Sequence, residues 1–178
     1  MIARFKKSCR RFCADQDGSG PVEVVLYTTA LLVLLGTSVE LGIINLKQAL
    51  LERALAVSVR DVRLNTGASP DYAAIKHRIC EEMTASNTCE ANMMLEMKVA
   101  EPTNFVGLPD IIDCINAEEE PRPSRQFEPG LDNDLMLMRA CFKYKPIFPT
   151  SRLSASVSMD QNGYAQLVAR AMFVQEPR

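Results

Sequence analysis

The chain has 178 residues, with 20 Lys and Arg against 22 Asp and Glu, one histidine and no tryptophan. This length accommodates one modest domain plus a membrane segment. Because the Lys and Arg residues do not gather into a stripe, the composition gives no reason to expect a nucleic-acid-binding surface. The charge is nevertheless uneven: residues 1–18 hold five basic and two acidic side chains, so the remainder is acidic.

An apolar stretch follows this basic segment. Residues 24–39 contain no charged side chain, and the apolar pattern continues past Glu40 as far as residue 46. The range 21–46 is long enough for a tilted helix to cross about 30 Å of hydrocarbon. A cleaved signal peptide is the alternative, but its apolar core is usually about 7–15 residues long, and residues 36–38 make a poor cleavage site. The pattern favours a single-pass membrane protein with a cytoplasmic N-terminus.

Glu23 is an acidic residue near the start of the apolar stretch. A carboxylate at the centre of a membrane helix costs roughly 2.5–3.5 kcal/mol on insertion scales, and less near an interface. Two interpretations stay open from the residues alone. Either Glu23 lies at the level of the headgroups without a partner, or a positive group pairs with it.

The helical pattern continues beyond the membrane segment. No proline interrupts the chain between Val22 and Ser69, and Asn65-Thr-Gly67 supplies a stop, so one helix is expected from about Pro21 to Leu64. Its second half is amphipathic and forms a stalk. The apolar side chains expected on one face of that half are Leu46, Leu50, Ala54, Val57 and Leu64.

The remaining residues predict a small α+β module. A second helix is expected to run to about Met83, with Ser69 as its N-cap and Pro70 in the first helical position. The further expected elements are a strand over 93–99, a short helix over 108–114, a solvated loop over 118–125, a strand over 134–145, and a strand over 165–174 after the Asn162-Gly163 turn.

The six cysteines fall into two groups on either side of the apolar stretch. Cys9 and Cys13 belong to the basic segment, on the reducing side of a membrane. The other four lie in the exported part, where an even number predicts two disulfides with three possible connectivities. The expected pairs are the two cysteines close in sequence, and then the two left over: Cys80–Cys89 and Cys114–Cys141.

No pattern in the sequence indicates catalysis or a cofactor. His77 lies three residues before Cys80, but the cysteines lack the spacing of zinc sites. Any catalytic triad would need this one histidine, for which a place on a helix surface is the simpler interpretation. The segment 132–134 lacks the rest of a calcium loop, no glycine-rich phosphate cradle is present, and Glu118-Glu-Glu120 is expected to be solvated. We therefore expect no enzymatic activity, cofactor, metal or small-molecule substrate.

The stretch Gly18-Ser-Gly-Pro-Val-Glu23 resembles the cleavage site of type IV prepilins: a glycine after a basic leader, an acid five residues later, and then an apolar helix. Nearly the whole chain is similar to the TadE-like minor pseudopilins (TadE/TadG family) of the tight-adherence (Flp) pilus system. The further segments that carry the resemblance are 51–55, 59–64, 139–142 ahead of Phe148-Pro149, and 173–177.

The chain also departs from the family pattern. Pro21 stands where the family more often has threonine, and Val24 stands where phenylalanine is common. Neither change removes the glycine or the acid, and a proline is tolerated in the first turn of a helix. The acid–tyrosine pair of the major Flp pilin is absent, because Tyr27 lies four residues after Glu23. This argues against the role of main filament subunit.

The resemblance implies a function and an organisation. Prepilin peptidase would cleave after Gly18 and leave Ser19 as the new N-terminus, and Glu23 would act in assembly with other pilus and pseudopilin subunits. The expected segments are a leader (1–18), a transmembrane helix in the inner membrane (19–46), a helical stalk (47–66) and a periplasmic module (67–178). The alternatives are an uncleaved bitopic anchor with a periplasmic binding module, and a type II secretion pseudopilin.

Overall fold

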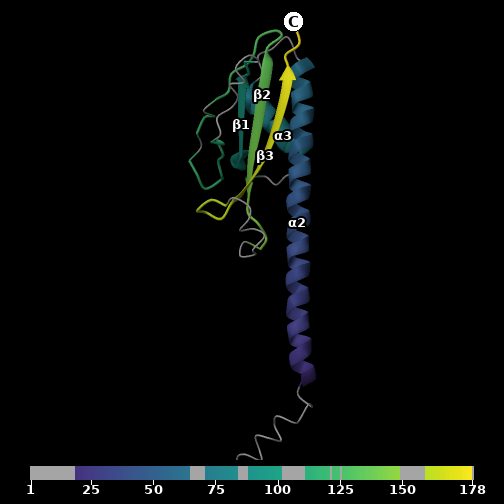
Figure 1. Cartoon of the computed structure of the whole chain (residues 1–178). Coiled ribbons are helices and arrows are strands. Elements are labelled where there is room, and N and C mark those ends of the chain that lie inside the picture. Colours follow the sequence, from purple (N-terminus) through teal and green to yellow (C-terminus); the bar gives the residue numbers. More distant parts are fainter. Residues whose placement is uncertain are drawn as a thin grey trace, which may run out of the picture. The chain divides into compact units, whose positions relative to one another are not determined.

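The computed structural model describes residues 19–64, 71–83, 88–101, 111–120, 122–124, 126–148 and 159–177. The chain divides into two compact units, residues 1–39 and 40–178. The described part of the first unit is entirely helical. The second unit contains a three-stranded sheet, a short helix and the C-terminal part of the long helix, which confirms a long apolar helix and a small strand-containing module (Figure 1).

Helix α2 (Ser19–Leu64) is the long helix expected from the sequence. It is continuous over 46 residues because the only proline, Pro21, lies in the first turn, where its missing N–H leaves no intrahelical bond unmade. The start of α2 also places Ser19 inside the helix, while Gly18 and the rest of the expected leader lie outside the described residues.

The face of α2 that packs on the sheet is not the apolar face that the sequence singled out. Leu51, Leu55 and Val62 are buried in the core of the second unit, whereas Leu46 is 59% exposed. Of the five residues expected on one apolar face, only Ala54 is buried against the module. The reason is that apolar residues lie on more than one side of this helix, and periodicity alone does not tell which side the sheet covers.

Helix α3 (Tyr72–Glu82) begins later than expected. Its N-cap is Asp71, whose side chain accepts a hydrogen bond from the backbone N–H of Ala74 at 3.1 Å. The prediction of Ser69 as N-cap was therefore wrong, and Ser69 and Pro70 lie outside the described residues. Aspartate at this position satisfies an otherwise unpaired N–H of the first turn, which explains why the helix starts here.

The sheet consists of β1 (Met93–Val99), β2 (Leu135–Tyr144) and β3 (Ala165–Val174), in the order β1-β2-β3 with antiparallel neighbours. A short 3-10 helix, η1 (Glu90–Asn92), precedes β1. All three strands agree with the sequence prediction to within a residue. Gly163, in the turn before β3, has a φ of 76°, a conformation that glycine adopts without strain.

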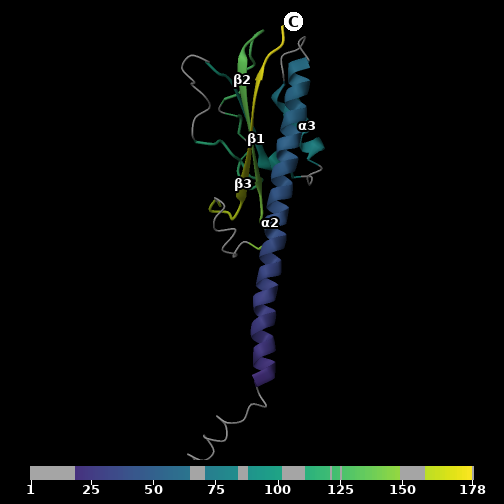
Figure 2. The same ribbon diagram turned by 45° about the vertical axis from the view of Figure 1, so that its right-hand side comes forward.

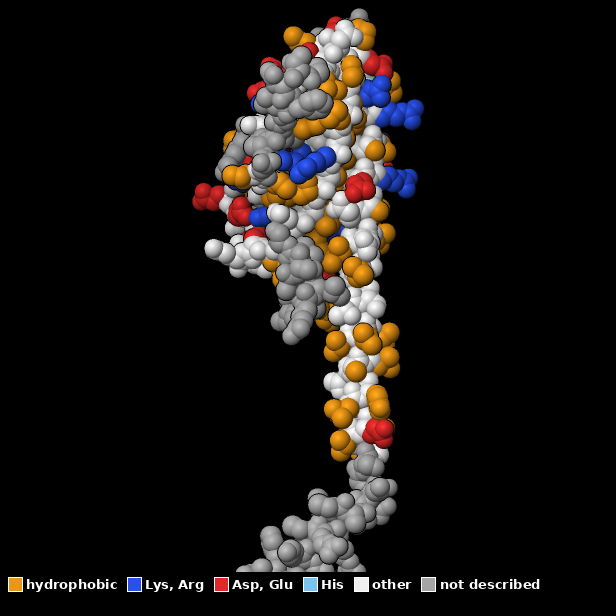
Figure 3. Space-filling model, in the orientation of Figure 1, with side chains coloured by type: hydrophobic (Ala, Val, Ile, Leu, Met, Phe, Trp, Pro, Cys, Tyr) orange, Lys and Arg blue, Asp and Glu red, His pale blue; other side chains and the backbone are white. Residues whose placement is uncertain are grey.

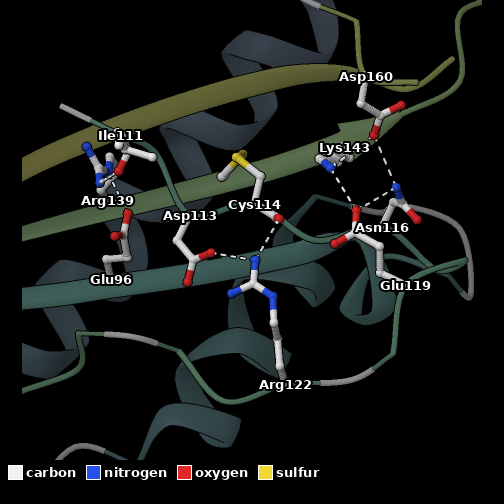
Figure 4. Close-up of a disulfide and its surroundings, with 11 residues drawn as sticks. Glu96, Ile111, Asp113, Cys114, Asn116, Glu119, Arg122, Arg139, Lys143 and Asp160 are labelled. Carbon is white, nitrogen blue, oxygen red and sulfur yellow. Dashed lines mark hydrogen bonds and ion pairs between the residues drawn. A yellow bond between two sulfur atoms is a disulfide. The ribbon is translucent and has the colours of Figure 1, made fainter. Parts of the chain in front are cut away.

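The two faces of this sheet are covered by different kinds of structure. Helices α2 and α3 cover one, the helix face, and both share a single apolar core with it (Figure 2). An irregular segment, residues 111–120 and 122–124, covers the other, the loop face (Figure 4). The short helix expected over 108–114 was wrong for residues 111–114, which are not helical. The sheet residues on the helix face are Met93, Leu95, Met97, Met136, Met138, Ala140, Phe142, Tyr144, Ala165, Leu167, Ala169 and Phe173.

Candidate functional site

Residues 20–39 of α2 form an exposed apolar surface. Eleven large apolar side chains in this stretch are between 54% and 70% exposed, and groups of orange side chains lie along its visible face in Figure 3. The helix is long and apolar enough to cross a membrane by length and composition. Its hydroxyl groups are partly satisfied within the helix: Thr37 and Ser38 donate to the Leu34 carbonyl at 2.9 and 2.8 Å, and Thr29 donates to that of Val25. Such bonds reduce the cost of placing hydroxyls in an apolar environment.

Glu23, the residue expected to act in assembly, lies on this apolar surface. Its side chain is exposed, and no hydrogen bond or ion pair joins it to a residue that the structure describes. Of the expected cleavage site, Gly18 lies outside the described residues and Ser19 begins helix α2. Within the described part of one chain, Glu23 is thus an acid on an apolar helix surface.

A second acid of α2, Glu40, was not singled out from the sequence. Its side chain is fully buried, and its two carboxylate oxygens accept hydrogen bonds from the backbone N–H groups of Ile147 and Phe148, at 3.3 and 3.2 Å. The signal in the sequence was a carboxylate interrupting an otherwise apolar run. Its partners, more than a hundred residues away, carry no such signal because any residue has a backbone N–H.

The structure contains both expected disulfides. Cys80–Cys89 joins α3 to the segment before β1, with a Cα–Cα distance of 5.7 Å, and Cys114–Cys141 attaches the irregular segment to β2, with a Cα–Cα distance of 5.5 Å. The predicted connectivity is therefore confirmed. Cys9 and Cys13 lie outside the described residues.

The loop face carries a buried ion pair beside the second disulfide (Figure 4). Glu96 on β1 and Arg139 on β2 are register partners, and each side chain is only 2% exposed. Arg139 Nε donates to Glu96 Oε2 at 2.6 Å, and a terminal nitrogen donates to the carbonyl of Ile111 at 3.2 Å. The guanidinium therefore donates hydrogen bonds both to the carboxylate and to the backbone of the covering segment.

A second charged cluster lies further along the same face, around Lys143. Its ammonium donates to Glu119 and Asp160, both at 3.0 Å, and Asn116 also donates to both carboxylates. Burial disfavours the charge on Asp160, but bonds from the Tyr164 N–H, Lys143 and Asn116 outweigh burial and lower its pKa. For Lys143, burial is likewise outweighed by its two carboxylate partners, and the pKa is raised.

The acidic segment 118–120 takes part in these contacts. Glu119 bonds Lys143, and Glu118 pairs with Lys145 at 2.7 Å. The expectation of a solvated run holds for Glu118, which is exposed, whereas Glu119 is half-buried against Lys143 of β2. Glu120 alone is exposed without a described ion pair.

A pocket of about 240 Å³ opens on the loop face between these clusters. Asp113 on its wall is 4% exposed and pairs with Arg122 at 2.5 Å, which in turn donates to the Cys114 carbonyl at 3.2 Å. The second carboxylate oxygen of Asp113 makes no hydrogen bond within the described structure. Paired charges dominate the pocket, and no nucleophile activated by a base is present among its lining residues.

His77 lies on the exposed surface of α3. Its Nδ1 is 2.7 Å from Glu90, and this hydrogen bond raises the pKa of the imidazole. The described residues contain no group of three His, Cys, Asp or Glu side chains placed to hold a metal ion. Cys80, three residues after His77, is bonded to Cys89, and Cys114 is bonded to Cys141.

Comparison of the chain with family models, with curated proteins and with solved structures found no match in any of the three.

Proposed function

We propose that the chain is a minor pseudopilin-like component of tight-adherence (Flp) pilus biogenesis, similar to the TadE-like family. In this proposal the N-terminal part of α2 anchors the protein in the bacterial inner membrane and packs with the helices of other pilus subunits. The observation that carries the proposal is an exposed apolar helix, residues 20–39, headed by an acid and joined to a disulfide-bonded module. The chain has no catalytic role in it.

The exposed apolar surface supports anchoring because it is too large for a protein dissolved in water. Monomeric soluble proteins rarely expose contiguous apolar patches of more than a few hundred Å². Transferring each Val or Leu side chain out of water contributes about 1.5–3 kcal/mol. With eleven large apolar side chains more than half exposed in residues 20–39, lipid or neighbouring helices are needed to cover them.

The two disulfides support a periplasmic location for the module. Disulfides form and persist in oxidising compartments, which include the bacterial periplasm. The basic residues of segment 1–18 suit the cytoplasmic side of the membrane. Both features give the same orientation, with the N-terminus inside and the module outside.

Glu23 supports subunit packing because an acid on a lipid-facing helix needs a partner. Cleavage after Gly18 would give Ser19 a free α-amino group, which is largely positive at neutral pH. In a staggered bundle, the carboxylate of one subunit can meet the amine of the next. That pairing would offset the cost of keeping both charges in an apolar environment, and removal of one would strand the other.

The apolar residues of α2 that the module leaves uncovered offer a further packing surface. Leu46 and Leu64 are 59% and 58% exposed, and Leu50 and Val57 are half-buried. They lie on a different side of the helix from the residues buried against the sheet. A neighbouring helix would cover them in an assembled bundle.

The first test is the mature N-terminus. Protein purified from the native host with and without prepilin peptidase is sequenced from its N-terminus by mass spectrometry. We expect Ser19 in the first strain and Met1 in the second, and Gly18→Phe should prevent cleavage. Met1 in both strains would overturn the pseudopilin proposal and favour an uncleaved anchor.

The second test is the role of Glu23. Glu23→Val should leave membrane insertion intact and reduce both pilus number and co-purification with other subunits. Glu120→Val makes the same chemical change at an exposed site of the module and serves as the matched control. Normal piliation in the Glu23→Val strain would mean that the acid is only tolerated.

A further inference from the structure

Two large apolar side chains are exposed side by side just after β2. Ile147 is 60% exposed and Phe148 is 45% exposed, in a segment that follows the strand and its Lys145-Pro146 pair. Single exposed apolar residues are common on protein surfaces, whereas two adjacent large ones form a small apolar patch that a partner can cover. The chemistry of their neighbours indicates the partner.

Glu40 holds the backbone of this segment. Its two oxygens accept the N–H groups of Ile147 and Phe148, and its side chain is fully buried. The two hydrogen bonds hold the main chain of residues 147 and 148, and both of their apolar side chains stay exposed to solvent. They also satisfy the carboxylate within the protein, which reduces the cost of placing a charge near hydrocarbon.

Chain connectivity links the residue that holds this segment, Glu40, to the end of the apolar stretch. Glu40 directly follows Val39, the last residue of the apolar run, and consecutive Cα atoms are about 3.8 Å apart. The Ile147 N–H is then only one glutamate side chain and one 3.3 Å hydrogen bond away. If residues 20–39 cross the hydrocarbon, Ile147 and Phe148 are necessarily close to its boundary.

A basic residue lies at a suitable distance beyond that boundary. Lys47 is seven residues after Glu40 on α2, about 10 Å along a helix axis. Its ammonium lies 5.3 Å from the ring centroid of Tyr144 and makes no ion pair with a described residue. The polar headgroup layer adds about 5–7 Å on each side of the hydrocarbon. Lys47 can therefore reach lipid phosphates at the outer edge of that layer.

We propose that Ile147 and Phe148 insert into the boundary between headgroups and acyl chains on the periplasmic side of the bilayer, with Glu40 holding their backbone in place. This inference rests on the proposed membrane anchoring of residues 20–39. It adds a second contact with lipid, made by the folded module and separate from the helix. The partner is the phospholipid surface.

Single-tryptophan variants test this contact, because the chain has no tryptophan of its own. The full chain carrying Phe148→Trp is reconstituted into phosphatidylcholine vesicles at a low protein-to-lipid ratio. Quenching by lipids brominated at shallow and deep acyl positions is compared with quenching by acrylamide in the water. Val33→Trp reports the anchor. Leu131→Trp is the control, since Leu131 is 73% exposed and precedes the opposite end of the ten-residue strand β2, about 33 Å away.

We expect the tryptophan at position 148 to lose most of its fluorescence to shallow bromines, the one at 33 to deep bromines, and the one at 131 to acrylamide only. Quenching at 33 without bromine quenching at 148 would overturn the inference and leave the anchor intact. Protection of position 148 from both quenchers would also overturn it, because a second protein would then cover the segment. Absence of bromine quenching at 33 would instead contradict the proposed anchor, while bromine quenching at 148 would still support the lipid contact.

Discussion

The two faces of the sheet are stabilised in different ways. On the helix face, apolar side chains such as Leu95 and Met138 are fully buried against α2 and α3, whose backbones satisfy their own hydrogen bonds. On the loop face the cover is an irregular segment, whose carbonyl and N–H groups need partners from elsewhere. The buried charges supply some of them: Arg139 donates to Ile111 and Arg122 to Cys114.

This difference explains why a small module buries so many charges. A helix can be packed by non-directional apolar contact, whereas an irregular segment is held by directional bonds that depend on register. The loop face should therefore be sensitive to the loss of individual partners, and the helix face to the loss of volume. Each of the following experiments measures the free energy of unfolding of the full chain in detergent, by urea titration followed through the near-ultraviolet circular dichroism of tyrosine.

The largest effect is expected from breaking the buried ion pair. Arg139→Met leaves the Glu96 charge buried without its partner, which typically costs about 3–5 kcal/mol. The double variant Glu96→Leu/Arg139→Met removes both charges and should recover most of that loss. Equal stability of the single variant and the unaltered protein would contradict this account of the loop face.

The two disulfides should contribute different amounts to the free energy of unfolding, because they close loops of different length. The bridge on the loop face, Cys114–Cys141, spans 27 residues, and Cys80–Cys89 spans 9. A chain-entropy treatment gives losses of about 3.5 and 2.6 kcal/mol when each pair is replaced by alanine. The variant without Cys114–Cys141 should therefore lose more stability than the variant without Cys80–Cys89. The reverse order would mean that Cys114–Cys141 is not the main attachment of the irregular segment to the sheet.

On the helix face, loss of volume should be the costly change. Leu95→Ala removes a fully buried side chain and should cost about 3 kcal/mol, within the usual range of 2–5. Leu131→Ala, the same change at a 73% exposed site, should stay within about 0.5 kcal/mol. A similar loss in both variants would show that the apolar core does not stabilise this face.

The smallest effect concerns pH and the Lys143–Asp160 pair. The pKa of Asp160 is lowered, so its stabilisation is present above about pH 4 and disappears as the pH falls through the still lower folded value. The pKa of Lys143 is raised, so its stabilisation is present below about pH 10.5 and is lost as the pH rises through the higher folded value.

Because solvent screens these partly exposed groups, each contribution should be less than about 1 kcal/mol. Asp160→Asn should flatten the dependence of unfolding free energy on pH at the acid end. Asp134→Asn is the control, since that carboxylate caps a local turn through the Leu131 N–H. If the unfolding free energy of Asp160→Asn falls at acid pH as steeply as that of the unaltered protein, the lowered pKa of Asp160 is contradicted.

Local patterns were sufficient for the long helix and the three strands. The long α2 helix follows from an uninterrupted run without internal proline, and the three strands follow from alternation bounded by turns and prolines. The position of four cysteines after the apolar stretch was sufficient to expect two disulfides. These properties depend on neighbours in the sequence, which is why the sequence by itself determined them.

Tertiary structure decided which side chains meet. Sequence analysis missed three of these contacts. They are the buried side of α2, the pairing of Glu96 with Arg139, and the hydrogen bonds of Glu40 to the backbone of residues 147 and 148. Each depends on contacts between segments tens of residues apart in the chain. Register fixes these contacts, since a shift of one residue in β2 would turn Arg139 to the helix face. The sequence therefore determined the long helix, the three strands and the presence of two disulfides, and packing decided which charges are buried and which backbone groups they bind.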